Sequence, residues 1–193
     1  LLKAFGAELV LTPGHLGMTG AIEEAVRQAD KIGNAFIPQQ FKNPSNPQVH
    51  YDTTAEEIWR DTEGKIDILV AGVGTGASIS GIGSKLRENN PNLEIIAVEP
   101  EDSPVISGGQ AGPHMIQGIG AGFIPDNLEK SLLNEIVKVS NEDALIMSRN
   151  LAKKEGVLVG ISAGANVHAA VEIGKKAKNK NKQIVTILCD FGE

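Results

Sequence analysis

The chain has 193 residues, of which 41% are hydrophobic and 22% are charged, and its formal net charge is −6. This composition is typical of a folded globular protein and unlike that of a disordered chain. Since nucleic acids and anionic membranes attract basic surfaces, the acidic balance argues against both as partners. No apolar run approaches the roughly 18 residues of a membrane-spanning helix. A single cysteine, Cys189, excludes an internal disulfide and favours a cytoplasmic location.

The first forty residues alternate between strand and helix patterns. An apolar run over residues 8–12, closed by a Pro-Gly pair, predicts a strand and its turn. From Met18 the apolar residues recur at helical spacing, and Gly33 ends this helix. Residues 35–38 predict a second strand.

The two ends and one internal segment bear on the organisation of the chain. Residues 1–4 read as the interior of a helix, and the chain stops directly after a strong strand pattern, so we expect it to be part of a longer protein. Residues 43–47, rich in Asn and Pro, predict a loop. A helix with acidic residues in its first turn is expected to start at Thr54.

The next unit carries the clearest pattern. A buried strand over residues 66–71 runs into a glycine-rich turn over residues 72–78, and a strand over residues 93–98 follows. The helix between them places three apolar residues on one face: Ile79, Ile82 and Leu86. This is a βαβ unit, which predicts parallel strands.

Residues 103–127 contain many Gly and Pro and predict a long irregular loop. Loops of that length in compact domains usually serve a function. A helix over residues 140–155 follows, with Ser140 and Asp143 as its capping pair.

The last two elements are a helix that starts at Ser162 and a strand. The expected apolar face of the helix consists of Val167, Ala170, Val171 and Gly174. Residues 184–188 are apolar and β-branched, which is typical of the middle of a parallel sheet. The fold class is therefore α/β, with a mostly parallel sheet and helices on both faces.

The glycine-rich turn admits three interpretations. Backbone N–H groups at a helix start lack partners and attract anions, so a strand, a glycine turn and a helix favour a phosphate site. Residues 72–77 also match the dinucleotide pattern G-x-G-x-x-G/A, and Glu99 ends the next strand where a ribose-binding acid would lie. The hydroxyls of Thr75 and Ser78 favour a single terminal phosphate over a pyrophosphate. A tight turn that binds nothing is the third alternative.

Further motifs resolve this choice by resemblance. QQFKNPSNP at residues 39–47, GVGTGAS at residues 72–78, GPHMIQGIGAGF at residues 112–123 and GISAGA at residues 160–165 resemble, in order and spacing, the motifs of cysteine synthases (O-acetylserine sulfhydrylases). The residues DFGE at 190–193 resemble the opening of another motif of that family. The resemblance extends over nearly the whole chain.

The resemblance implies a pyridoxal 5′-phosphate (PLP) enzyme of fold type II. The implied reaction is a transferase reaction in cysteine biosynthesis, in which a lyase-like β-elimination of O-acetyl-L-serine gives an α-aminoacrylate that sulfide converts to L-cysteine, with release of acetate. It also implies a homodimer, and serine acetyltransferase as a partner that docks its C-terminal tail in the active site. Residues 1–50 would be the remainder of the smaller α/β domain, and residues 51–193 the larger, phosphate-binding α/β domain.

Carried over residue by residue, the resemblance assigns cofactor binding to Gly74, Thr75, Gly76, Ala77, Ser78 and Ser162. The last of these would hydrogen-bond the pyridine nitrogen, although Ser162 read alone is a plain helix N-cap. Substrate binding falls to Gln40, Gln117, Gly118 and Gly120. Two residues depart from the family pattern: Ala77 stands for the usual Gly and Ser78 for the usual Thr. Ala77 requires a backbone conformation that tolerates a methyl group.

The Schiff-base lysine of the family belongs to an upstream segment that does not match these residues. No lysine here is assigned to that role, and we expect the 193 residues alone to lack catalytic residues and synthase activity. Two further functions stay open, a cystathionine β-synthase-like PLP enzyme and an NAD-dependent dehydrogenase built on the glycine turn. The four histidines show no metal-ligand spacing, so no metal site is predicted, and Cys189 is expected to pack in the core.

Overall fold

The chain forms two compact units. The structure, a computed structural model, describes residues 1–192, and these divide into Leu1–Gln39 and a second unit that begins at Gln40. None of the described helices is long and apolar enough to cross a membrane.

The first unit contains one long helix, α1 (Gly17–Ile32), preceded by a 3-10 turn, η1 (Gly14–Leu16). Gly33 ends α1 in the left-handed conformation, as predicted. Residues 1–4, expected to be helical, form a single turn closed by the Phe5 N–H on the Leu1 carbonyl (3.1 Å).

The two strands predicted in the first unit do not form. Residues 8–12 and 35–38 adopt no regular secondary structure and pair with no strand among the described residues. The side chains of Leu11 and Phe36 are 88% and 84% exposed. The prediction was wrong because an apolar run becomes a strand only where a neighbouring strand satisfies its N–H and C=O groups.

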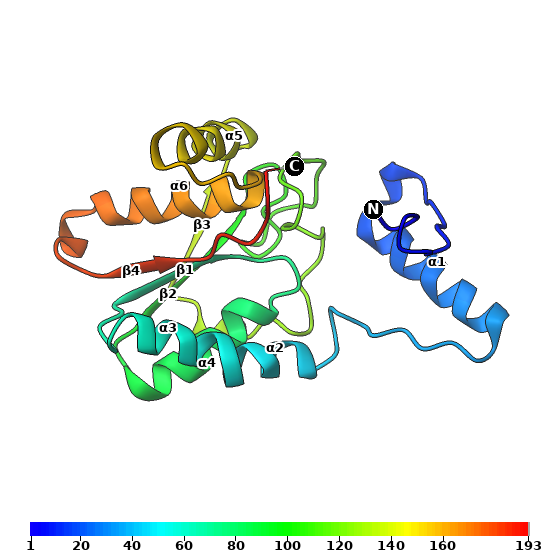
Figure 1. Cartoon of the computed structure of the whole chain (residues 1–193), viewed down its shortest axis with the longest axis horizontal. Coiled ribbons are helices and arrows are strands. Elements are labelled where there is room, and N and C mark those ends of the chain that lie inside the picture. The colour runs from blue at the N-terminus through cyan, green and yellow to red at the C-terminus, as the bar shows by residue number, and fades with distance from the viewer. Residues whose placement is uncertain (193) are drawn as a thin grey trace. The chain divides into compact units, whose positions relative to one another are not determined.

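The second unit is built on a four-stranded parallel sheet (Figure 1). Its strands are β1 (Ile68–Gly72), β2 (Glu94–Pro100), β3 (Glu135–Val139) and β4 (Ile184–Thr186), in the order β3-β2-β1-β4. Ile68 pairs with Glu94 in β2 and with Ile184 in β4. Among the described strands β4 is therefore at the edge and half-buried, whereas the sequence suggested a central strand.

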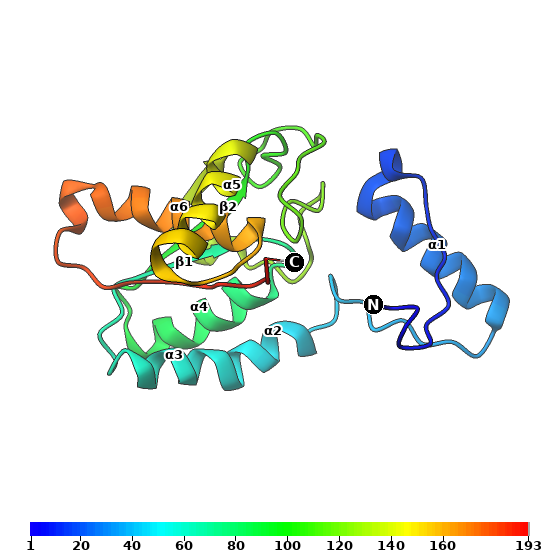
Figure 2. The same ribbon diagram turned by 45° about the horizontal axis from the view of Figure 1, so that its top comes forward.

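Helices cover both faces of this sheet, as predicted. In the views of Figures 1 and 2, α5 (Asn141–Asn150) and α6 (Ile161–Lys175) lie on one side, and α2 (Ser45–Val49), α3 (Ala55–Asp61) and α4 (Ala77–Asn89) lie on the other. Successive strand residues point to opposite faces of the sheet and pack into two hydrophobic cores. Leu69 packs with α4 in one core, and Ile68 packs with α6 in the other. The α4 face of Ile79, Ile82 and Leu86 is fully buried, as predicted.

The helix expected at Thr54 starts earlier. Asn43 Oδ1 accepts a hydrogen bond from Ser45 N–H (3.0 Å), and α2 continues through a π-helical turn, η2 (His50–Thr54), into α3. The prolines that predicted a loop at residues 43–47 instead occupy the helix start, where a missing N–H costs nothing. Helix α5 is capped as predicted, with Ser140 Oγ accepting from Asp143 N–H (3.1 Å), and ends in a second π-helical turn, η4 (Leu151–Glu155).

A long irregular segment, residues 101–129, follows β2 at the carboxyl edge of the sheet. It leads into a 3-10 turn, η3 (Lys130–Leu132), and another 3-10 turn, η5 (Ala177–Asn179), precedes β4. The irregular segment was predicted over residues 103–127. In parallel α/β sheets this edge is where ligands bind.

Candidate cofactor and substrate site

The glycine-rich turn joins β1 directly to α4. Gly76 precedes the first helical residue in a left-handed conformation (φ 79°), which only glycine adopts without strain. Within the described residues, the backbone N–H groups of Gly74, Thr75 and Gly76 have no hydrogen-bond partner. These groups and the first turn of α4 together form an anion site of the kind found at helix N-termini.

The departure at Ala77 causes no strain. Ala77 is the first residue of α4 and is 1% exposed, and its φ angle is negative. The positive φ falls one residue earlier, on Gly76. The methyl group of Ala77 is therefore compatible with the loop, and its backbone N–H is retained, within 3.4 Å of Thr75 Oγ1.

The segment 117–120 packs closely against the glycine turn. The Gly120 N–H donates to the Val73 carbonyl (3.0 Å), and a Cβ added to Gly74 would lie 2.3 Å from the Gly118 carbonyl oxygen. A Cβ on Gly118 (φ 98°) would lie 3.3 Å from Ser162 Oγ. The turn, this segment and the start of α6 therefore meet around Gly118. His114 Nε2 donates to the Gly120 carbonyl (2.9 Å) and ties the segment down.

The start of α6 is held by a residue from after β4. Asp190 accepts hydrogen bonds from Ser162 N–H (3.2 Å) and Ala163 N–H (2.9 Å), and the N-cap position itself is Gly160. Ser162 is thus not the N-cap, because the Asp190 carboxylate performs that function. The Ser162 side chain, 2% exposed, is left free to face Cys189, whose Sγ lies 3.2 Å from Ser162 Oγ.

Cys189 is exposed, so the expectation that it packs in the core was wrong. Its sulfur nevertheless lies against Ser162 and within 3.8 Å of Asn166 Nδ2. Burial of the sulfur raises the pKa of the thiol, and the charge of Asp190 acts in the same direction, whereas the hydrogen bond with Ser162 lowers it. The strand that was expected to bury Cys189 ends at Thr186.

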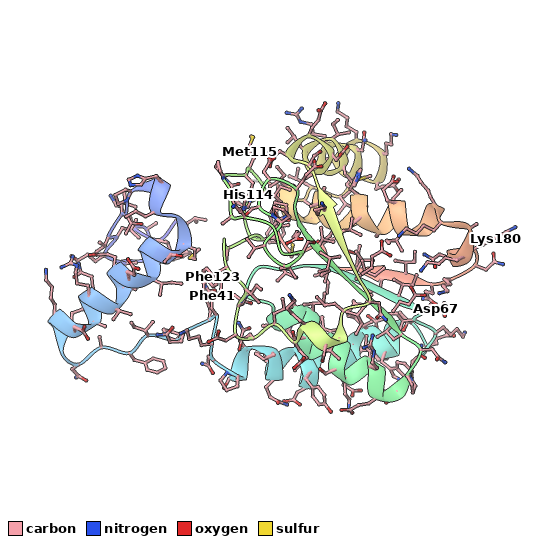
Figure 3. All side chains as sticks on the ribbon, turned by 180° about the vertical axis from the view of Figure 1, so that it is seen from behind. Phe41, Asp67, His114, Met115, Phe123 and Lys180 are labelled. Carbon is pink, nitrogen blue, oxygen red and sulfur yellow. The ribbon has the colours of Figure 1, made fainter. Side chains whose placement is uncertain are left out.

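Gln40 is tied to the glycine turn through its backbone. Its carbonyl accepts from Asn46 Nδ2 (2.8 Å) and Asn127 Nδ2 (2.8 Å), and Asn46 Nδ2 also lies 3.4 Å from Thr75 Oγ1. The following residue, Phe41, meets Phe123 edge to face, with ring centroids 5.1 Å apart (Figure 3).

Glu99 does not serve the role that the dinucleotide interpretation gave it. Its carboxylate is 1% exposed and accepts from Ile106 N–H (2.8 Å), from Ser107 N–H (3.1 Å) and from the Ser107 hydroxyl. All three bonds hold the irregular segment to the end of β2. The dinucleotide hypothesis therefore loses its ribose-binding acid.

The structure brings together most of the residues that the sequence singled out. The glycine turn, Gly118, Gly120 and Ser162 converge, and Gln40 is anchored to the turn through Asn46, whereas the side chains of Gln40 and Gln117 are exposed. Sequence reasoning missed Asn166, Cys189 and Asp190. Asn166 could have been found, because it lies one helical turn after Ser162 and so on the same face of α6.

These residues fit PLP on two counts. Gly74 and Gly118 carry no side chain where the glycine turn, the 117–120 segment and Ser162 approach closely, and the unpaired N–H groups of the turn suit a phosphate. The Ser162 hydroxyl has the Cys189 thiol as its polar neighbour, and the nearby Asp190 carboxylate accepts from the backbone N–H groups of Ser162 and Ala163 and lies 4.0 Å from Cys189 Sγ. A neutral donor is therefore presented at this position.

The comparison with known families assigns the class. The family described as pyridoxal-phosphate dependent enzyme matches residues 1–190, and the parallel sheet with helices on both faces is that of fold type II enzymes of this kind. The chain belongs to this family of PLP-dependent enzymes.

Within the family, the similar proteins are cysteine synthases and their relatives. A cysteine synthase from Staphylococcus aureus is 53% identical over 194 residues, which cover 100% of this chain and 62% of the relative. A crystal structure of cysteine synthase from Entamoeba histolytica matches with a TM-score of 0.93 at 46% identity, covering 99% of this chain and 56% of that one. An O-acetylserine dependent cystathionine β-synthase from Helicobacter pylori matches with a TM-score of 0.94 at 37% identity, covering 100% and 62%. The chain thus spans less than two thirds of the length of these relatives.

Proposed function

We propose that the protein containing this chain makes L-cysteine and acetate from O-acetyl-L-serine and sulfide, by β-replacement with PLP as cofactor. The observation that carries the proposal is the convergence of the glycine turn, the Gly118 segment and the Ser162 hydroxyl. The similarity to a cysteine synthase at 53% identity supports the same reaction.

The phosphate group would bind at the start of α4. Gly74, Thr75 and Gly76 would offer their unpaired N–H groups, and Ala77 and Ser78 would add the first N–H groups of the helix. The Thr75 and Ser78 hydroxyls would supply further donors. The positive end of the α4 dipole favours the phosphate charge at this position.

The Ser162 hydroxyl would donate a hydrogen bond to the ring nitrogen. When bound, PLP supplies an electron sink for bond breaking at the α-carbon of an amino acid. Ser162 is a neutral partner and keeps its own proton, so it leaves the ring nitrogen unprotonated and the sink weak. In β-replacement, loss of acetate promptly removes the negative charge that develops at the α-carbon. A weak sink therefore suits β-replacement better than transamination.

Substrate would be held by the irregular segment and by Gln40. Gly118 and Gly120 lie against the glycine turn, and Gln117 is exposed beside them. Gln40, whose carbonyl is fixed by two asparagines, would present its side-chain amide to the substrate carboxylate.

The Schiff-base lysine would come from outside these residues. Lys42 and Lys65 form exposed ion pairs with Asp126 (3.8 Å) and Glu63 (2.5 Å), which supports leaving both unassigned. We propose that the 193 residues alone are inactive, and that residues 1–50 and 51–193 belong to the smaller and the larger domain of the complete enzyme.

A second candidate reaction uses a thiol amino acid in place of sulfide. The similarity to the Helicobacter pylori protein, an O-acetylserine dependent cystathionine β-synthase, favours it. Both reactions need the same phosphate site and the same Ser162 donor, and they differ only in the nucleophile. Supplying sulfide or homocysteine to the same preparation separates them.

The resemblance to cysteine synthases also supports a homodimer and a complex with serine acetyltransferase. Light scattering of the pure protein, with and without that enzyme, measures both. The single free cysteine of the chain suits a cytoplasmic enzyme.

The test is a visible absorption spectrum of the full-length protein with PLP, after its intact mass has been determined. A cofactor band should appear, O-acetyl-L-serine should shift it, and sulfide should restore it with release of cysteine. A cofactor band that O-acetyl-L-serine leaves unchanged would remove the proposal.

Two serine variants sharpen the test. Ser162→Ala should change the cofactor spectrum and lower the rate. Ser148→Ala should change neither, because the Ser148 hydroxyl is also buried but donates to the Leu145 carbonyl of its own helix (3.0 Å).

A further inference from the structure

Three polar side chains form a chain of contacts that ends at the Ser162 hydroxyl. Asn166 Nδ2 lies 3.8 Å from Cys189 Sγ, and Cys189 Sγ lies 3.2 Å from Ser162 Oγ. Asn166 and Ser162 are 1% and 2% exposed. The contacts therefore bring two side chains of α6 together with one residue from after β4.

The orientation of the Asn166 amide fixes the direction of the first contact. Asn166 Nδ2 donates to the Ile187 carbonyl (2.9 Å), and a flipped amide would instead set two oxygens against each other. The second N–H of the same nitrogen faces Cys189 Sγ. Since an amide nitrogen only donates, the sulfur accepts from Asn166.

The contact between Cys189 Sγ and Ser162 Oγ admits either atom as the donor, and the first contact leaves the thiol proton available for it. A thiol has one proton, and a sulfur that accepts from Asn166 keeps that proton for donation. Two acceptors lie near the thiol, Ser162 Oγ at 3.2 Å and Asp190 Oδ1 at 4.0 Å, and the shorter contact favours Ser162. If the thiol donates to Ser162, the hydroxyl proton of Ser162 has to point elsewhere.

We propose that Asn166 and Cys189 are positioning residues that orient the Ser162 hydroxyl, so that it donates a hydrogen bond to the acceptor bound beside it. This inference rests on the proposed function, in which that acceptor is the ring nitrogen of PLP. This chain of contacts, the Asn166–Cys189–Ser162 relay, makes the Ser162 hydroxyl a hydrogen-bond donor. An isolated serine hydroxyl instead rotates freely between donating and accepting.

Two features of the surroundings support the relay. Asp190, the neighbour of Cys189 in sequence, accepts from the N–H groups of Ser162 and Ala163. These bonds fix the position of the Cys189 sulfur relative to the Ser162 hydroxyl. The sulfur is partly buried against Ser162 and Asn166, and this burial raises the pKa of the Cys189 thiol.

The test is a double-mutant cycle on the full-length protein, with the dissociation constant and the absorption maximum of bound PLP as readouts. Cys189→Ala should weaken PLP binding about three- to tenfold, the effect of one hydrogen bond, and should shift the absorption maximum. Cys189→Ser retains a donor and should restore most of the lost affinity. In the Ser162→Ala background, Cys189→Ala should change neither readout.

Each remaining outcome overturns the inference. A wild-type affinity and spectrum in Cys189→Ala would show that the thiol does not orient Ser162. An equal loss in both backgrounds would show that Cys189 acts through packing alone. Failure of the unmodified protein to bind PLP would refute the proposed function itself, and this inference with it.

Discussion

The Asp190 carboxylate accepts a hydrogen bond from Ala163 N–H at 2.9 Å, across 27 residues of sequence. With its bond to Ser162 N–H, this contact places a carboxylate at the N-terminus of α6, where the helix dipole favours negative charge. The same contact sets the residue before it, Cys189, against the Ser162 hydroxyl. One cap therefore stabilises the helix and also positions the site.

Replacing Asp190 should affect both stability and cofactor binding. Asp190→Ala leaves two backbone N–H groups of α6 without their acceptor, and loss of a helix N-cap costs about 1–2 kcal/mol. We expect the free energy of unfolding of the full-length protein, measured with urea, to fall by that amount and PLP binding to weaken. Asp190→Asn retains an acceptor and should lose less. Asp61→Ala, at an exposed aspartate, should lose almost nothing.

The glycine turn should not tolerate a side chain at Gly74. A Cβ there would lie 2.3 Å from the Gly118 carbonyl oxygen, so Gly74→Ala has to push the 117–120 segment away from the turn. We expect at least a tenfold loss of PLP affinity, measured by titration of the apoprotein. Gly174→Ala is the matched control. Its Cβ would meet only Ile184 Cδ1, at 3.4 Å, and Ala within a helix is favoured over Gly by about 1 kcal/mol. Equal affinity in the two variants would contradict the assignment of the turn.

The elements that were predicted correctly from the sequence are those whose own residues form a clear apolar pattern. The strand–turn–helix unit from Ile68 to Pro100 was predicted because two apolar runs flank a helix with one apolar face, and it forms with parallel strands. Strand β3 was missed, because Glu135 and Lys138 interrupt its apolar pattern and the strand is at an edge of the sheet.

The buried face of α6 could not be predicted from hydrophobicity. The expected face contained Val171, which is 39% exposed, while Ser162, Asn166 and Ala169 are buried. Small and polar residues face inward here because the site and the β4 segment need hydrogen bonds and close backbone approach at this position. Asn166 and Cys189 could not be predicted as positioning residues for the same reason.

We expect Glu99 to stabilise the fold rather than to bind a ligand. Glu99→Gln removes the charge that accepts from the backbone N–H groups of Ile106 and Ser107, and its new amide donor would face another donor. Since hydrogen bonds to charged groups contribute about 1.5–3 kcal/mol, we expect a loss of about 2 kcal/mol in urea unfolding. Proteolysis within residues 101–129 should also become faster. Glu101→Gln, two positions along the chain and exposed, should match the unmodified protein in both measurements.

The ion pairs of Glu94 should make stability depend on pH in the acidic range. Hydrogen bonds from Lys182 and Lys178 hold the pKa of the Glu94 carboxyl below its ordinary value of 4.5. A folded-state pKa below the unfolded value means that the carboxylate stabilises the protein above pH 4.5, and that this contribution disappears as the pH falls through the lowered pKa. Glu94→Gln should therefore cost up to about 1 kcal/mol in urea unfolding at pH 7, and this cost should shrink as the pH is lowered below 4.5. Glu155→Gln, at an exposed residue, is the control, and should show no difference from the unmodified protein at neutral or at acidic pH. A cost of Glu94→Gln that persists at low pH would show that the residue acts through packing, because protonation would already have removed the charge.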